Sequence, residues 1–344
     1  MRMIPLTHLQ SNNILAIDIL DENSKVLLTK GQLLTAGLVN RLKNTNLACV
    51  YIIDKYSQDQ VPTYTAIPQN ILQRISTLNE LRNINQSGQG DFETLLKIMH
   101  TVNDIVYTLY AGKQNYRLNY EPNKLLTKSP TETNIYVAIT TTLFALKLGW
   151  NPNDAVNLCL AVLLRDIGLA AHFGSSNIAR QKHPINGANF LKSTYDLPEE
   201  ILEIIRQHHE LYDGTGFPNK LHGDNICKGA RILKIVDLYY SLQEKMWQNP
   251  ARASVLTEDL QIRTSYLDPV YLGLFMNNVD IFHKDMLLQL TCGDIGIVVK
   301  TVKTSPLTPI LKIIKSSNPS HVNQLVKVAS QPGFKIKSLV YYVD

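Results

Sequence analysis

Two adjacent histidines, His208 and His209, are followed by an acid and by a glycine-rich loop that ends at Pro218. Imidazole nitrogens and carboxylate oxygens suit iron, manganese and zinc as ligands. Further groups of these types occur upstream at Asp166 and His183, and downstream at Asp237. This combination predicts metal chemistry rather than core packing. Such metals can act as Lewis acids and can make a bound water nucleophilic near neutral pH.

Four segments carry a recognisable pattern: 164–168 (Leu-Arg-Asp-Ile-Gly), 183–184 (His-Pro), 208–218 (His-His-Glu-Leu-Tyr-Asp-Gly-Thr-Gly-Phe-Pro) and 231–237 (Arg-Ile-Leu-Lys-Ile-Val-Asp). Together they resemble the HD-GYP family of bacterial cyclic di-GMP phosphodiesterases, and this chain is a divergent member by that resemblance. The family's His-Asp pair reads Arg165-Asp166 here, and its Gly-Tyr-Pro reads Gly216-Phe217-Pro218. The function of the protein therefore depends on whether the metal ligands that remain still form a working site.

The resemblance implies a ring of His and Asp ligands that holds two or sometimes three metals in a helical bundle. Four residues match the ligands of one metal: Asp166, His183, His208 and His209. Asp166 would also bridge to the second metal and is the predicted catalytic residue. For that second metal only Asp237 remains, since the family's histidines fall at Thr133 and Arg165. We expect a divalent cation, iron or manganese, with one ion or none bound.

Arginine carries only hydrogen-bond donors and stays protonated, so Arg165 cannot bind a cation. In one interpretation its guanidinium fills the vacated volume and pairs with Asp237 or Asp166, replacing the positive charge of a metal. In the other, Arg165 turns to the surface and Asp237 is an ordinary hydrogen-bonding acid. The sequence leaves both open.

The loop after the histidines is predicted to help bind the ligand, together with Arg165. Its members are Gly214, Gly216, Phe217 and Pro218, and the glycines suit a tight loop with positive φ angles. Two cations that the family directs at phosphate are replaced by Leu169 and Leu211. The scaffold is thus expected to persist while phosphate-binding groups are lost.

The predicted fold class is mainly α: an HD-type helical bundle with a small α+β N-terminal domain and a β-rich C-terminal appendage. The expected boundaries are 1–60 for the N-terminal domain, 61–120 for a linker and helices, 121–283 for the HD-GYP-like domain and 284–344 for the appendage. Periodicity and capping signals predict strands at 14–20, 26–28 and 47–53, helices at 36–42, 71–81, 92–105, 151–164 and 198–207, and strands at 286–290, 296–299 and 310–314.

Composition limits the remaining possibilities. The net charge is +5 and hydrophobic residues make up 44%, with no apolar run long enough to span a membrane and no secretory signal apparent. Four widely spaced cysteines are expected to be reduced, which suits a cytoplasmic protein. The lysine-rich C-terminal segment has no arginine and few aromatic residues, so nucleic-acid binding is not expected.

The favoured functional hypothesis is a degenerate HD-GYP protein in cyclic di-GMP signalling. It would be weakly active or inactive and would bind cyclic di-GMP or a signalling protein, with a homodimer as a further possibility. The alternative is an active phosphodiesterase with a reduced metal site, in which Arg165 stabilises charge on the phosphate. A third hypothesis is an adaptor without any nucleotide contact.

Overall fold

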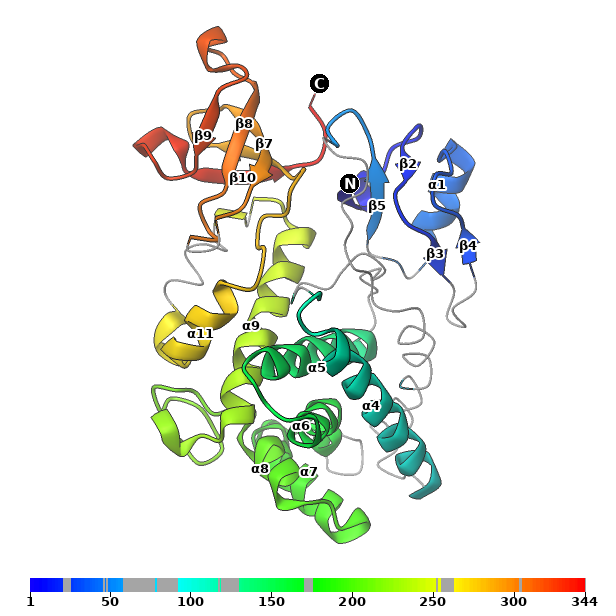
Figure 1. The fold of residues 1–344 in the computed structure, drawn as a ribbon, viewed down its shortest axis with the longest axis vertical. Helices are drawn as coiled ribbons and strands as arrows, with labels where there is room; N and C mark the ends of the chain where they lie inside the picture. The colour runs from blue at the N-terminus through cyan, green and yellow to red at the C-terminus, as the bar shows by residue number, and fades with distance from the viewer. Residues whose placement is uncertain are drawn as a thin grey trace.

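The computed structural model describes residues 1–20, 26–45, 47, 49–57, 78, 92–116, 118, 130–169, 176–251, 253–254, 263–302 and 305–343. Within these ranges the mainly α architecture with two flanking β-containing parts is confirmed (Figure 1). The helix expected at 71–81 lies outside the described residues except for Leu78, as does most of the segment 61–91 that was expected to include the linker. None of the described helices combines the length and apolar character needed to cross a bilayer.

The helical bundle occupies the lower half of Figure 1. Its helices are α4 (Phe92–Gly112), α5 (Pro130–Lys147), α6 (Pro152–Leu164), α7 (Asn177–Tyr195), α8 (Glu199–Gln207), α9 (Lys228–Gln248) and α11 (Pro269–Met276). Helix α5 packs on α6 and α9, whereas α7 packs on α8. Asn151 caps α6 by accepting the amide of Asp154, and Pro152 opens its first turn, as the sequence predicted.

Helix α6 is the innermost element of the bundle. Eight of its 13 residues are buried, including every residue from Leu158 to Leu164. A helix that is apolar almost all round cannot turn a face to water, so it is fixed between its neighbours. The chain leaves α6 at Arg165, and Asp166 follows directly. The rigid, buried helix therefore fixes the place of both residues.

The N-terminal part contains β1 (Arg2–Pro5), β2 (Ile14–Leu15), β3 (Ile19–Leu20), β4 (Val26–Leu28), α1 (Ala36–Lys43) and β5 (Cys49–Ile53). Strands β1, β5 and β2 form one antiparallel sheet in that order, and β3 pairs with β4 separately. The prediction of a single strand at 14–20 was wrong, because this segment forms two short strands, β2 and β3, in different sheets. The chain bends between the two sheets, and the Asp18 carboxylate in this bend accepts the amide of Lys30.

The C-terminal part is a five-stranded antiparallel sheet with the order β10-β6-β7-β8-β9. Its strands are β6 (Leu287–Leu290), β7 (Ile295–Lys300), β8 (Ile310–Lys315), β9 (Leu325–Lys327) and β10 (Ile336–Val340). The first three were predicted, and β9 and β10 complete the sheet. Both ends of the chain lie in the upper part of Figure 1. The buried Arg2 donates to Asp54 and to the carbonyl oxygen of Tyr341.

Candidate metal centre

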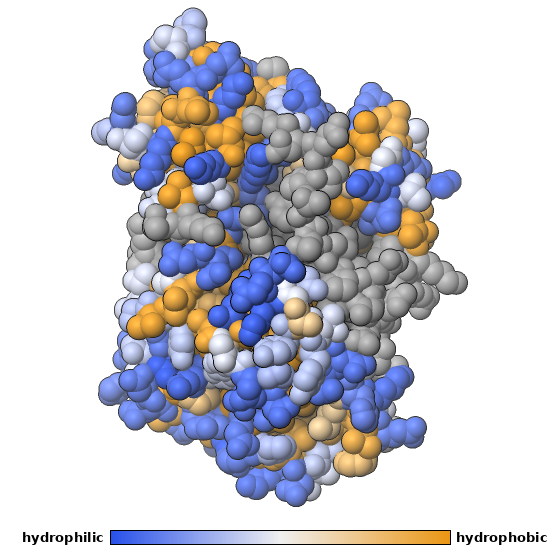
Figure 2. Space-filling model, viewed as in Figure 1, coloured by the Kyte–Doolittle hydropathy of each residue, from blue (hydrophilic) through white to orange (hydrophobic). Residues whose placement is uncertain are grey.

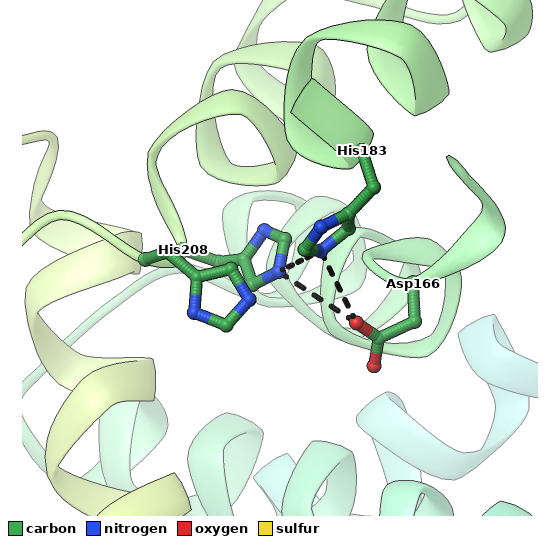
Figure 3. Close-up of side chains that lie close together, drawn as sticks. Asp166, His183 and His208 are labelled. Atoms are coloured by element: carbon green, nitrogen blue, oxygen red, sulfur yellow. Dashed lines mark hydrogen bonds and ion pairs between the residues drawn. The ribbon is translucent and has the colours of Figure 1, made fainter. Parts of the chain in front are cut away.

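Three successive helices bring the predicted ligands of the first metal together. Asp166 follows α6, His183 lies within α7, and His208 and His209 follow the last turn of α8. One ligand atom of each residue lies within 4.8 Å of the corresponding atoms of the other three. Figure 3 shows Asp166, His183 and His208 directed toward one another. The site thus gathers residues up to 43 positions apart, counted from Asp166 to His209.

Two glycines allow this close approach. A Cβ on Gly168 would lie 2.1 Å from the carbonyl oxygen of His183, and one on Gly187 would lie 3.0 Å from the Gly168 amide nitrogen. No larger residue fits at Gly168 unless the backbone moves. The turn after α6 therefore packs directly on α7, which places the Asp166 carboxylate beside the His183 ring.

The imidazole rings are oriented as metal ligands would be. The Nδ1 atoms of His183 and His208 contact the carbonyl oxygens of Arg180 and Ile205 respectively. A carbonyl only accepts hydrogen bonds, so each Nδ1 carries the proton and each neutral ring has its lone pair on Nε2. The two Nε2 atoms face one another at 3.1 Å, and Asp166 Oδ1 lies 3.5 Å and 3.7 Å from them. A divalent cation would satisfy these three facing acceptors, so the donor set fits a metal.

The ionisation states agree with this arrangement. Burial favours a raised pKa at Asp166, but contacts with His183 and His208 and the Arg165 charge outweigh it and hold the pKa well below its usual value. Burial lowers the pKa of His208, and it lowers that of His209 to about 2 with help from neighbouring positive charge. The site therefore presents the Asp166 carboxylate beside the neutral imidazoles of His208 and His209, the forms that bind cations.

The loop after the histidines is held by a buried acid. Glu210 is 2% exposed and accepts the amides of Asn219 at 2.7 Å and Leu221 at 3.0 Å. The ring of Phe217 stacks on His209 with centroids 4.5 Å apart, which supports one side of the cluster. Glu210 was not singled out from the sequence as a positioning residue. Its burial depends on the loop's return toward α8, which no local pattern reveals.

The two loop glycines serve different purposes. Gly214 has a φ of +81°, as expected for a tight loop. Gly216 is not among the glycines with positive φ, so the expectation of the same role for it was wrong. A Cβ at Gly216 would instead lie 2.3 Å from the Leu211 amide nitrogen. Gly216 is thus required for close backbone approach, and it brings Phe217 and Pro218 back to the histidines.

Arg165 occupies the other side of Asp166. It is 8% exposed, so its guanidinium lies inward, as in the first of the two interpretations. Nη2 lies 3.3 Å from Asp237 Oδ1, Nε lies 3.5 Å from Asp166 Oδ2, and Nη1 donates to the Val162 carbonyl. Asn134 on α5 also accepts from Nη1 through its side-chain oxygen. The guanidinium joins both acids that a second metal would have needed.

Two further residues belong to the part of the site where a second metal would bind. Thr133, which falls where the family has a histidine, is half-buried on α5 next to Asn134. Asp237, on α9, lies outside the group of four ligands, and its side chain is 42% exposed. Its part in metal binding stays a prediction. Asn134 could not be found from the sequence, because its role arises only once Arg165 turns inward.

Comparison with known proteins places this site in a family. Residues 121–269 match the HD domain model. The cyclic di-GMP phosphodiesterase PA4108 of Pseudomonas aeruginosa is 27% identical over 138 residues, 40% of this chain and 33% of that protein. The cyclic di-GMP phosphodiesterase PdeB of Borreliella burgdorferi is 24% identical over 58% of this chain and 56% of that protein. The HD domain match and these relatives support membership of the HD-GYP family.

Two other comparisons add detail. The 3'3'-cGAMP-specific phosphodiesterase 2 of Vibrio cholerae is 32% identical over 30% of this chain and 20% of that protein. The solved structure of Bd1817, an HDG"Y"P protein from Bdellovibrio bacteriovorus, aligns with a TM-score of 0.49 at 18% identity, over 80% of this chain and 97% of that one. The matches in sequence cover between 20% and 56% of the length of these phosphodiesterases.

Proposed function

We propose that this protein is a degenerate HD-GYP protein that holds one divalent cation and binds cyclic di-GMP with little or no hydrolysis. Asp166, His183, His208 and His209 would hold the cation, as iron or manganese. Bound there, it would supply positive charge to a phosphodiester. The protein would act in signalling by sensing the nucleotide instead of degrading it.

The observation that carries this proposal is the position of Arg165. Its guanidinium contacts Asp166 and Asp237 and is held by Asn134, so one fixed positive charge stands where two acids converge. A cation that approached Asp237 would meet this charge at close range in a half-buried site, where repulsion is strong. Two-metal hydrolysis, which clamps both the attacking and the leaving oxygen, is therefore not supported.

The choice of ligand follows from the relatives. Two of them are named as cyclic di-GMP phosphodiesterases and another as a phosphodiesterase for 3'3'-cGAMP, so the shared chemistry is a cyclic dinucleotide. Cyclic di-GMP is the member we propose here. The cGAMP relative makes 3'3'-cGAMP the appropriate comparison ligand in a binding experiment.

One observation favours the alternative of a working phosphodiesterase with a single cation. The Asp166 side chain is 40% exposed, so a substrate can reach the carboxylate. Arg165 Nε, 3.5 Å from that carboxylate, could then stabilise charge that develops on the phosphate. The two proposals share the cation site and differ only in turnover.

We further propose a cytoplasmic location. All four cysteines are free thiols, two of them buried, which suits a reducing compartment. A signalling protein partner and a homodimer remain predictions from the sequence.

The test is turnover and binding by the same preparation. Purified protein loaded anaerobically with manganese or iron(II) is incubated with cyclic di-GMP, and the linear and mononucleotide products are separated by chromatography. Binding is measured by calorimetry beside the His208→Ala variant, with 3'3'-cGAMP for comparison. We expect cation-dependent binding without product. Product that forms in the parent and is lost in His208→Ala would establish the alternative, and absence of any nucleotide binding would leave the adaptor hypothesis.

A further inference from the structure

The C-terminal part of the chain carries all of its net charge. Residues 284–344 contain eight lysines, no arginine, three aspartates and no glutamate, which gives +5 at neutral pH. The whole chain also carries +5, so residues 1–283 are balanced. A net charge that is concentrated in one part of a protein attracts oppositely charged partners to that part.

The acids of this part do not neutralise its surface. Asp285 and Asp294 are only 1% and 2% exposed, and Asp294 is engaged within the sheet by Ser316 and His321. Several lysines, by contrast, reach the surface and have no acidic partner among the residues that the structure describes. They are Lys300, Lys312, Lys327, Lys335 and Lys337.

Strand β8 turns one of these lysines away from the core, between aliphatic residues. Leu311 and Ile313 are fully buried, whereas Ile310, Lys312 and Ile314 are half-buried. Successive side chains of a strand point to opposite faces, so the half-buried set lies on the face of the sheet that points away from the core.

The pairing of β8 with β9 extends this face. Lys327 lies opposite Ile310, and Leu325 lies opposite Lys312. Directly opposed side chains on one face are about 5 Å apart, so Ile310, Lys312, Leu325 and Lys327 form one group, which we call the lysine patch. Figure 2 shows hydrophobic surface bordered by hydrophilic surface over the C-terminal sheet, at the upper left of the view.

Protection of an open sheet edge does not account for the patch. Lysines on edge strands prevent a sheet from pairing with another sheet, and Lys327 on β9 and Lys337 on β10 lie on the two edge strands. Lys312 lies on β8, which is paired on one side with β7 and on the other with β9. Its charge can therefore act only on a partner that faces the sheet.

We infer that the lysine patch binds the surface of a bilayer that contains anionic phospholipid. Lysines are attracted to the phosphates of such lipids, and exposed aliphatic side chains beside them add apolar contact at the interface. Leu325 is 68% exposed, and Val322, in the loop before β9, is 37% exposed. Nucleic acid matches the patch less well, because the patch contains neither arginine nor an aromatic ring.

This inference does not depend on the proposed function, because the patch shares no residue with the metal centre. The lysine patch would hold the protein against a membrane from one side.

Binding to vesicles tests the inference. The whole chain is mixed with vesicles of phosphatidylcholine alone, or of equal parts phosphatidylcholine and phosphatidylglycerol, and the bound fraction is measured by co-sedimentation at low and high salt. The test variant carries Lys312→Gln and Lys327→Gln. The matched control carries Lys43→Gln and Lys245→Gln, which remove the same charge from exposed positions outside the sheet. Thermal unfolding is measured on every variant.

We expect binding to the anionic vesicles only, weakened by salt because exposed charges are screened. The test variant should bind at least about tenfold more weakly with an unchanged melting temperature, since each lysine near an anionic lipid surface contributes to binding. The control should bind like the parent.

Three results would overturn the inference: no binding of the parent to anionic vesicles, equal binding to the neutral vesicles, or equal weakening in the test variant and the control. Binding of a nucleic-acid duplex in place of vesicles, dependent on Lys312 and Lys327, would also overturn it and would assign the patch to that partner.

Discussion

The guanidinium of Arg165 lies 3.3 Å from the carboxylate of Asp237, across the gap between the end of α6 and the face of α9. An arginine and an acid have replaced what in the HD-GYP pattern is a histidine and an acid that share a metal. The charge of the acid is balanced from within the chain, so the fold does not need a second ion there. Arg165 is thereby both a packing residue and a fixed cation.

Loss of this guanidinium should destabilise the bundle. We expect Arg165→Gln to lower the free energy of unfolding by about 1–3 kcal/mol, since it removes hydrogen bonds to Val162 and Asn134 and leaves two acids without their partner. Urea unfolding in EDTA measures this without a contribution from bound metal. Arg206→Gln is the control: Arg206 pairs with the exposed Glu199, and its loss should change little. Equal losses in the two variants would contradict a structural role for Arg165.

The close approach at Gly216 leads to a second prediction. Gly216→Ala places a Cβ 2.3 Å from the Leu211 amide nitrogen, so the loop must shift and carry Phe217 away from His209. We expect weaker manganese binding and a lower melting temperature. Gly273→Ala is the control, because nothing lies within 4 Å of its Cβ in α11 and alanine favours the helix by up to about 1 kcal/mol. Unchanged manganese affinity in Gly216→Ala would mean that the loop does not position the ligands.

The C-terminal sheet provides a pH-dependent prediction away from the metal centre. Burial favours a raised pKa at Asp294, but contacts with Ser316 and His321 outweigh it and hold the pKa below its usual value. A lowered folded pKa gives stability that is present above the unfolded pKa and is lost as the pH falls through the folded one.

Asp294→Asn should therefore be less stable than the parent at pH 7 by about 1–3 kcal/mol, the range for hydrogen bonds to a charged group. The difference should shrink as the pH is lowered from 5 toward 3, because the parent carboxylate then takes up its proton. Urea unfolding at a series of pH values measures both. A difference that stays constant over this pH range would show that the charge of Asp294 is not what stabilises the sheet.

Local patterns in the sequence were enough for much of the fold. The helix that begins after Asn151 and the three strands from Leu287 onward carry clear capping and periodic signals, and they lie where expected. Strands β1 and β10 were not expected, since each pairs with a strand far along the chain, and β9, which pairs with the preceding strand β8, has only three residues. Local propensity does not encode such pairing.

For the site, the ligand residues could be predicted from the sequence, but their packing could not. Family register grouped Asp166 with the three histidines, and the structure brings these four together. Asn134 was missed as a contributor, because it acts through a contact made between helices. The orientation of Arg165 was left open, since a cation beside two acids can face inward or outward until the burial of α6 is known.

The number of metal ions per chain tests the central claim most directly. Protein loaded with excess manganese(II) under anaerobic conditions, then freed of unbound ion, is analysed by elemental mass spectrometry beside His208→Ala. The account predicts one manganese per parent chain and essentially none in the variant, since Arg165 excludes a second ion from Asp237. Two ions per parent chain would contradict it, because a second metal would then bind in spite of the guanidinium.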